Sequence, residues 1–306
     1  MNGILNVLKP PGMTSHDVVN FIRKLTKVKK VGHTGTLDPL ACGVLPVCLG
    51  RATKIIEYLP SNKTYRAEIT LGQKTDSGDL AGRFLTLSRW LKVSRLEFEQ
   101  ALEQFRGWIK QIPPMTSAVH YQGKKLYELA RRGLEVEREA RLVEITNLEL
   151  IVWQPPKVLI EVGCSAGTYI RTLTLDLVEV LGCGACLSFL LRTQAGMFSL
   201  REALTLPEIK AAVQAGTLAD RLCSLEQALS RFPAVHLHPS AARSVASGAR
   251  LYLPGVLTYP MDLALDSLVR LVCENKVIAM GKFREIENEL CFQPVKGLVD
   301  ALSLET

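Results

Sequence analysis

The sequence predicts an α+β protein with a large sheet-containing unit followed by a smaller β-rich unit. Three observations predict this class. Apolar or alternating segments typical of strands are spread along the chain, amphipathic helical stretches lie between several of them, and the pattern changes after residue 230. A length of 306 residues, of which 47% are apolar, agrees with about two domains and a sizeable core.

The first predicted elements are a strand over Gly3–Leu8 and a helix that begins at Ser15. Pro10-Pro11-Gly12 is a strong turn signal between them. Ser15 can cap the helix, because apolar residues then recur at helical spacing from Val18 to Leu25. The helix ends in a run of basic residues, which are Arg23, Lys24, Lys27, Lys29 and Lys30. We expect this basic surface to lie beside the loop that follows and to contact phosphate.

That loop, VGHTGTLDPLA at residues 31–41, is predicted to be irregular because of its glycines and proline. Apolar Val44–Leu49 after it predicts a buried strand that holds the loop against the core. Its single carboxylate, Asp38, is therefore expected to be rigid and partly desolvated, which suits a nucleophile or general base. The alternative is a turn-capping aspartate, as is common before proline, and composition does not choose between the two.

Further strands are predicted over Thr64–Leu71, Arg141–Trp153 and Val158–Cys164. Ser94-x-x-Glu97 is a capping box that opens a helix through Phe105, and a second helix is expected from Gly167-Thr168 to Val180. These elements belong to the first unit, residues 1–230.

Residues 231–306 predict a separate β-rich module. A short helix is expected near Pro239–Ser247, followed by apolar strand-like segments at Leu268–Cys273, Val277–Lys282 and Glu289–Phe292. We place the domain boundary near residue 231.

The formal net charge of +7 lies entirely in residues 1–230, whereas residues 231–306 are neutral. Such an excess suits a polyanionic partner, although many basic proteins have none. The apolar runs fall well short of the roughly 20 residues that a membrane-spanning helix needs, which excludes an integral membrane protein of that kind. The N-terminus lacks the pattern of a secretory signal, so we expect a cytoplasmic protein.

The eight cysteines do not form a recognisable metal site. Only Cys183-Gly-Ala-Cys186 has ligand-like spacing, and no second pair follows at a usable distance. We expect buried thiols and no metal.

One long segment resembles a known family. Gly32–Val47 (GHTGTLDPLACGVLPV) closely resembles the signature loop of the TruB family of tRNA pseudouridine synthases. Further matching motifs follow in family order across residues 3–200: Gly3–Pro10, Gly12–Ser15, Lys63–Ala67, Thr75–Asp79, Pro113–Ala118, Gly123–Glu128, Gly167–Arg171 and Arg192-Thr193.

The resemblance implies both a fold and a reaction. The fold is a mixed, mostly antiparallel sheet flanked by helices, with the active site in a basic cleft that crosses it. These enzymes isomerise the uridine at position 55, in the T-loop of tRNA, to pseudouridine without a cofactor. On this resemblance Asp38 is the nucleophile, and the sequence leaves open whether it attacks C1′ or C6. The uridine must first flip out of the stack.

The resemblance also assigns roles to other residues. Tyr65 matches the pocket tyrosine that stacks on the flipped base and is a candidate for removing the C5 proton. Arg171 matches the arginine that pairs with the catalytic carboxylate, and such a pair lowers the pKa of a carboxyl group. Tyr169 and Leu190 match positions that line the pocket. From pattern alone, Tyr65 would be an ordinary strand aromatic and Arg171 a surface arginine. Tyr169 and Leu190 would be core residues, which is compatible with lining a pocket.

Two more residues are expected at the RNA, and two positions depart from the family. His33 matches a histidine near the vacated base, and Lys9 is expected on phosphate. Thr116 stands where the family usually has tyrosine, and His120 where it usually has lysine. An aromatic and a cation are therefore missing, which puts RNA contacts there in doubt.

The expected partner is tRNA, bound by a monomer. The segment Phe105–Glu149, within an insert of about residues 105–150, resembles the region that grips the T-arm. Residues 231–306 more loosely resemble a PUA domain, which would reach the acceptor stem or serve a structural role. A non-catalytic RNA chaperone with the same fold is the main alternative. An aspartate-based phosphotransferase is disfavoured, because no phosphate-binding loop or carboxylate cluster accompanies Asp38.

Overall fold

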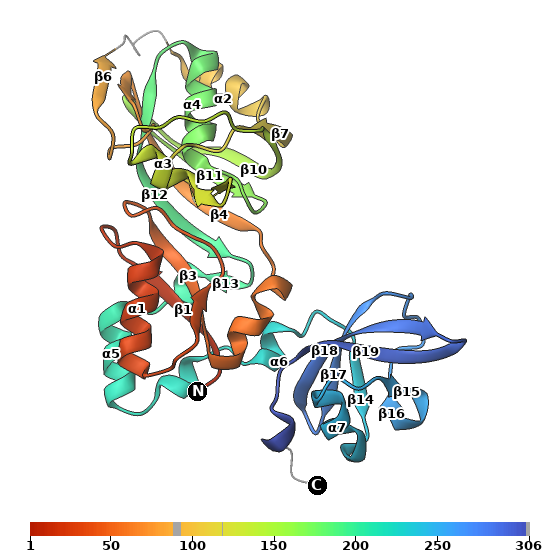
Figure 1. The fold of residues 1–306 in the computed structure, drawn as a ribbon. Helices are drawn as coiled ribbons and strands as arrows, with labels where there is room; N and C mark the ends of the chain where they lie inside the picture. Colours follow the sequence, from red (N-terminus) through yellow and green to blue (C-terminus); the bar gives the residue numbers. More distant parts are fainter. Residues whose placement is uncertain (88–92, 118, 304–306) are drawn as a thin grey trace.

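The computed structural model describes residues 1–87, 93–117 and 119–303, so Ala118 of the Pro113–Ala118 motif lies outside the described residues. The main sheet has the strand order β1-β3-β12-β4-β11-β10-β7 (Figure 1). All neighbours along this order are antiparallel except β3 and β12, which pair in parallel. With helices packed on this sheet and a second β-rich unit after it, the predicted fold class is confirmed.

One end of the sheet contains β1 (Gly3–Lys9) and β3 (Cys42–Leu49). Helices α1 (Ser15–Thr26) and α5 (Leu206–Gln214) cover it and share an apolar core cluster with the two strands (Figure 1). The helix cap differs from the prediction. Thr14, not Ser15, accepts the Asp17 amide in a capping box, and Ser15 is buried in the first turn, where its hydroxyl is used elsewhere.

The other end contains the long strands β4 (Lys63–Leu71), β10 (Arg141–Gln154), β11 (Lys157–Cys164) and β12 (Ala185–Ala195). Helices α2 (Arg95–Glu103) and α4 (Ile170–Leu181) pack on them. The Ser94 and Glu97 capping box is formed as predicted, whereas α4 begins two residues later than expected because Tyr169 is its N-cap.

Shorter elements complete this unit. Residues 31–33, predicted to be irregular, form a short strand β2 (Val31–His33) that pairs with β3. The others are η1 (Gly50–Tyr58), β5 (Gln73–Thr75), β6 (Phe84–Leu87), β7 (Gly107–Gln111), β8 (His120–Tyr121), β9 (Lys124–Lys125), α3 (Leu126–Ala130), β13 (Phe198–Ser199), η3 (Leu200–Glu202), η4 (Leu218–Arg221) and α6 (Leu225–Ala228).

The two ends of the sheet meet where β3 and β12 pair through Leu191 with Cys42 and Arg192 with Gly43. Gly43 has φ +112°, and a Cβ there would lie 2.2 Å from the Arg192 carbonyl oxygen, so only glycine fits. Residues 34–41, which carry Asp38, enter β3 at this junction. The junction therefore fixes where that loop sits relative to β12.

Residues 234–297 form a second sheet with the order β15-β19-β18-β17-β14-β16, which Figure 1 shows beside the main one. Its elements are β14 (Ala234–Leu237), α7 (Pro239–Ala246), β15 (Leu251–Tyr252), η5 (Leu253–Gly255), β16 (Val256–Thr258), β17 (Leu268–Cys273), β18 (Lys276–Ile286), β19 (Glu289–Gly297) and η6 (Ala301–Ser303). We call residues 231–306 the C-terminal unit. Its β-rich character matches the prediction.

The C-terminal unit docks on the first unit through an apolar cluster. Val272, Met280 and Leu298 share this cluster with Ile4 and Ala195 of the main sheet.

Within the described residues, no helix is both long enough and apolar enough to cross a membrane.

Candidate active site

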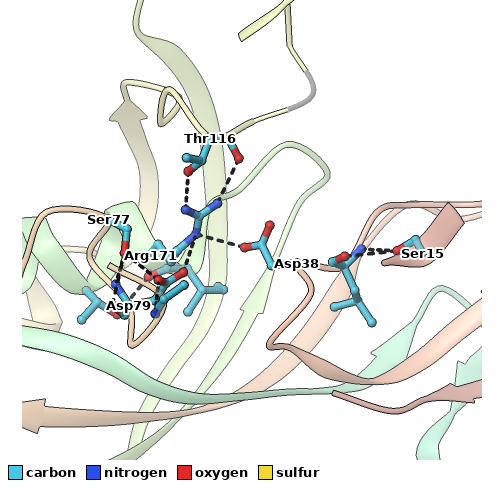
Figure 2. A network of polar contacts seen from close by, with 10 residues as sticks. Ser15, Asp38, Ser77, Asp79, Thr116 and Arg171 are labelled. Carbon is cyan, nitrogen blue, oxygen red and sulfur yellow. Dashed lines mark hydrogen bonds and ion pairs between the residues drawn. The ribbon is translucent and has the colours of Figure 1, made fainter. Parts of the chain in front are cut away.

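Asp38 lies in the loop between β2 and β3, where it faces α4 (Figure 2). Its Oδ2 atom is 3.0 Å from Nε of Arg171, in the first turn of α4. The Arg171 side chain is 5% exposed, whereas that of Asp38 is 37% exposed. The carboxylate is therefore held by a buried cation and still open to a molecule arriving from solvent.

The Asp38 loop is tied to the start of α1. The Ser15 hydroxyl donates to the Leu37 carbonyl at 3.2 Å and accepts from the Leu37 amide at 2.8 Å (Figure 2). Leu37 itself is buried in the core cluster under the sheet. The residue next to Asp38 is thus fixed through both its backbone and its side chain.

Lys9, the last residue of β1, also contacts the Asp38 loop. Its ammonium donates to the carbonyl oxygens of Pro10, Met13 and Pro39 at 2.8, 2.6 and 3.2 Å, and the side chain is fully buried. Burial lowers the pKa of Lys9 to about 8, against the attraction of the Asp38 carboxylate. The prediction that Lys9 meets phosphate is wrong in this structure, because no part of its side chain is exposed.

Arg192 of β12 is a second fully buried cation beside the loop. Nε donates to the Val44 carbonyl at 2.7 Å, and the two terminal nitrogens donate to the carbonyls of Gly35 and Thr36 at 3.1 and 3.4 Å. The three carbonyls belong to the loop and to the strand that follows it. Arg192 therefore acts as an internal donor that fixes the backbone around Asp38.

Arg171 is gripped on two sides. Its Nε atom also lies 3.6 Å from Asp79, whose carboxylate accepts from the Ser77 hydroxyl at 2.6 Å. On the opposite edge, the terminal nitrogens donate to the hydroxyl and the carbonyl of Thr116 at 2.5 and 3.3 Å (Figure 2). The guanidinium is held between two carboxylates and one threonine.

Two opposing effects set the pKa of Asp38. Burial raises the pKa of the Asp38 carboxyl above its usual range, and the Asp79 carboxylate adds to this shift. The Arg171 guanidinium and the Lys9 ammonium oppose it. The predicted effect of Arg171, which lowers the pKa of Asp38, is therefore present, but partial removal from water outweighs it and the net direction is upward.

Tyr65 lies on β4, opposite Arg192 on β12. Tyr65 is 6% exposed and shares a core cluster with Leu37, which precedes Asp38, and with Leu190, a predicted pocket residue. Burial raises the pKa of the Tyr65 hydroxyl, while Arg192, to which it is hydrogen-bonded, opposes the shift. The structure thus brings Tyr65 and Leu190 to the same side as Asp38, and Leu190 is largely buried at 9% exposure.

Tyr169 precedes Arg171 at the start of α4 and is half-buried. Its peptide groups are held by Gln111, at the end of β7, which accepts from the Tyr169 amide at 3.0 Å and donates to the Tyr169 carbonyl at 3.3 Å. Gln111 is 2% exposed. The buried Gln111 side chain therefore fixes the position of Tyr169, the N-cap residue of α4.

His33, at the end of β2, is half-buried, and its Nδ1 atom has no hydrogen-bond partner within the described residues. Burial lowers the pKa of His33, and the nearby Arg192 guanidinium lowers it further. The structure thus leaves one buried ring nitrogen of His33 without a partner at the end of β2.

The basic run at the end of α1 is not beside Asp38. Ser15, in the first turn of the 12-residue helix, is the residue that touches the loop, and Lys24 lies nine residues further along the helix, a rise of about 14 Å. Thr116, where an aromatic was expected, turns toward Arg171.

Sequence reasoning missed several residues that shape the site. Arg192, Asp79, Thr116, Ser15 and Gln111 carry the contacts described above. A signal existed for Arg192, since it is a charged residue directly after the mostly apolar segment Leu187–Leu191 and falls in a matching motif. Thr116 was marked only as a departure from the family, and no signal marked Gln111. Among the described residues, no group of three or more His, Cys, Asp or Glu side chains is arranged to hold a metal ion.

Two family models match this chain. Residues 23–170 match the model described as TruB family pseudouridylate synthase (N terminal domain), and residues 171–230 match the tRNA pseudouridylate synthase B C-terminal domain. The residues gathered around Asp38 fall within these two ranges, apart from Lys9 and Ser15.

Curated relatives cover nearly the whole chain. It is similar to the tRNA pseudouridine synthase B of Pelotomaculum thermopropionicum, with 46% identity over 304 residues and 96% of each chain covered. The protein of the same name from Moorella thermoacetica is 50% identical, with 92% of this chain and 93% of that one covered. For Bacillus subtilis the identity is 46%, with coverages of 83% and 84%.

Solved structures show the same arrangement. The chain is similar to one in a Cbf5-Nop10-Gar1 complex, with a TM-score of 0.75, 29% identity, and 99% of this chain and 87% of that chain covered. It is also similar to a chain of an H/ACA RNP bound to a substrate RNA containing 2′-deoxyuridine, with a TM-score of 0.74, 27% identity and coverages of 98% and 86%.

Proposed function

This chain belongs to the TruB family of pseudouridylate synthases, and from that premise we propose that it converts the T-loop uridine at position 55 of tRNA into pseudouridine. The proposed nucleophile is Asp38. Support for the substrate comes from the relatives, which are named tRNA pseudouridine synthases, and from the basic excess of residues 1–230.

The single observation that carries the proposal is the Asp38 and Arg171 pair. A carboxylate 3.0 Å from a buried guanidinium, on a loop fixed by Ser15 and Lys9, is placed rigidly and remains open to solvent. A structural ion pair needs no such openness. A nucleophile needs both properties, because its reacting oxygen must be held and also reached.

The reaction is an isomerisation, so its bonds balance without a co-reactant. A carboxylate oxygen of Asp38 bonds to C1′ or to C6, and the C1′–N1 bond breaks. The uracil turns, C5 bonds to C1′, and the bond to Asp38 is released with its electron pair. C5 loses its proton and N1 gains one, so the product has the composition of the substrate.

The remaining residues have roles that follow from their positions. Arg171 would keep Asp38 ionised against the burial that raises its pKa, and would orient one oxygen. Tyr65 would stack on the flipped uracil and help remove the C5 proton, with Arg192 opposing the rise in the Tyr65 pKa that burial causes. Tyr169, Leu190 and His33 would line the space around the base.

We assign the RNA contacts to two further regions. The insert at residues 105–150 would grip the T-arm, and the C-terminal unit, residues 231–306, would act as a PUA-like module near the acceptor stem. Their charges differ, since residues 231–306 carry no net charge. Strong phosphate binding is therefore expected from residues 1–230, acting in a monomer.

The test is a position-resolved assay. Purified protein is incubated with an unmodified tRNA transcript and with a matched transcript in which U55 is replaced by C. Nucleoside mass analysis after digestion should find about one pseudouridine per molecule in the first and none in the second. Pseudouridine at another position would overturn the assignment of position 55, and none in either RNA would favour the RNA-chaperone alternative.

A further inference from the structure

The outer edge of Arg171 is held by a residue that the reaction itself does not require. Nε of Arg171 faces the carboxylates of Asp38 and Asp79, while both terminal nitrogens face Thr116 (Figure 2). A guanidinium donates in the plane of a rigid fork. Fixing the terminal nitrogens therefore fixes the direction in which Nε points.

Thr116 is well placed to fix that direction because one residue supplies two acceptors. Its hydroxyl lies 2.5 Å from one terminal nitrogen and its carbonyl 3.3 Å from the other. Within the described residues, no other hydrogen bond to these two nitrogens is recorded. If the hydroxyl is removed, the guanidinium keeps one weak outer contact and can rotate about its long side chain.

The segment that carries Thr116 is itself anchored to the start of α4. Gln111, five residues earlier, brackets the Tyr169 peptide groups with two hydrogen bonds. On the other side, the Tyr127 amide donates to the Ser117 carbonyl at 3.0 Å, and Arg138 donates to the Pro113 carbonyl at 3.3 Å. Residues 111–117 are therefore held at both ends, and they contact Tyr169 through Gln111 and Arg171 through Thr116.

We propose that Thr116 is a positioning residue for the reaction, acting through Arg171 to aim that guanidinium at the reacting oxygen of Asp38. This inference rests on the proposed function, and it adds a residue that lies in the insert rather than in the sheet. The insert would then do more than hold RNA: its first loop also completes the catalytic ion pair.

The side chain of Thr116 can be changed without disturbing the core, because Thr116 is exposed. Thr116→Val keeps the shape and removes the hydroxyl, whereas Thr116→Ser keeps the hydroxyl. Thr217→Val, at an exposed position directly before η4, lies outside both regions assigned to RNA and is a matched control for the same chemical change. Three readouts separate positioning from a structural effect.

The first readout is tritium release from C5 of labelled uridine in a tRNA transcript, measured with enzyme in excess and again under turnover conditions. Thr116→Val should slow the single-turnover rate by about ten-fold, the effect of losing one hydrogen bond to a charged group at an exposed position. KM and RNA affinity should stay within two-fold. Thr116→Ser and Thr217→Val should match the unchanged protein.

The second readout is the acid limb of the rate. The charged groups facing Asp38 are Arg171, Asp79 and Lys9. Arg171 lowers the pKa of the Asp38 carboxyl and so favours its ionised form. A misaligned Arg171 opposes the burial less well, so Asp38 should ionise only at higher pH and the acid limb should move upward in Thr116→Val. The third readout is thermal unfolding, which should not change.

The outcomes are distinct. A Thr116→Val protein with an unchanged rate and acid limb would overturn the positioning role, and so would a loss confined to KM or a Thr116→Ser protein as slow as Thr116→Val. Absence of tritium release from the unchanged protein would instead overturn the proposed function, and the inference with it.

Discussion

The loop that carries Asp38 and the C-terminal unit are held in place by different kinds of interaction. The loop is held by directed polar contacts from Ser15, Lys9 and Arg192, all buried. The C-terminal unit packs on the first unit through an apolar cluster that includes Met280, and polar contacts join the two units as well, among them a hydrogen bond from Lys54 to the Gly297 carbonyl and the surface ion pair between Lys296 and Glu57.

The difference shows what each kind of contact is suited for. Apolar burial is strong but non-directional, so it joins two units without fixing single atoms. Buried hydrogen bonds from cations contribute little net stability but fix geometry, because an unsatisfied group would be costly. Substitutions that loosen the loop should therefore lower the rate, whereas substitutions in the apolar cluster should lower stability and leave the rate per folded molecule unchanged.

The largest effect is expected from Arg171, which links both sides of the site. Arg171→Gln should lower the rate by about 10² to 10³-fold, comparable to the loss of one transition-state donor. The pKa of Asp38 is already raised by burial, and removing the opposing cation should raise it further. Rate measured against pH should therefore show the acid limb at higher pH.

Arg171→Lys is the matched variant, since it keeps the charge but cannot contact Asp38 and Thr116 together. Its acid limb should lie between those of the other two proteins. If all three proteins share one acid limb, the group that titrates is not Asp38.

Arg192 tests whether the loop depends on buried donors. Arg192→Met removes three hydrogen bonds to loop and strand carbonyls, and should lower the free energy of unfolding by about 3 kcal/mol or more. Activity should fall as well, because the loop loses its fixed geometry. Urea unfolding and tritium release would be measured together.

Arg201→Met is the control, because Arg201 is exposed on η3 and has no recorded hydrogen bond from its side chain within the described residues. It should change neither measurement. Equal losses in both variants would mean that charge alone, rather than the buried contacts, supports the loop.

Met280 tests the other region. Its side chain is fully buried in the cluster between the two units, so Met280→Ala should lower the free energy of unfolding by about 2–5 kcal/mol. The acid limb and the single-turnover rate per folded molecule should stay the same at low temperature. A shifted acid limb would show that the two regions are coupled, against the comparison drawn above.

The smallest effect is expected from the surface ion pair. Glu57 and Lys296 are 58% and 38% exposed, so water and salt screen their attraction. Glu57→Gln should leave both the unfolding midpoint and the rate within experimental error. A clear loss of stability would show that the C-terminal unit depends on this pair and not on the apolar cluster.

Much of the fold could be predicted because the signals were local. Alternation over Thr64–Leu71 and apolar Leu268–Cys273 mark strands that the structure has at nearly the same bounds. The cap of α1 was assigned one residue late, since Thr14 and Ser15 can both cap and only the packed loop shows which hydroxyl is used elsewhere.

The site was less predictable because its contacts join distant parts of the chain. Asp38 stood out through its surroundings, and Arg171 through family resemblance. The parallel pairing that brings Arg192 to Gly43 joins residues far apart in sequence, and no periodicity reveals it. The prediction for Lys9 failed for a related reason. A lysine at the end of a predicted strand is expected to be exposed, but the following turn folds over Lys9 and accepts its hydrogen bonds.

The central claim is that Asp38 performs the chemistry while the rest of the site holds it in place. The most direct measurement is tritium release from C5 of labelled uridine in tRNA, comparing the protein with Asp38→Ala at equal RNA occupancy. We expect near-stoichiometric release by the first and none by the second, with RNA affinity within a few-fold. Release by Asp38→Ala at a comparable rate would contradict it.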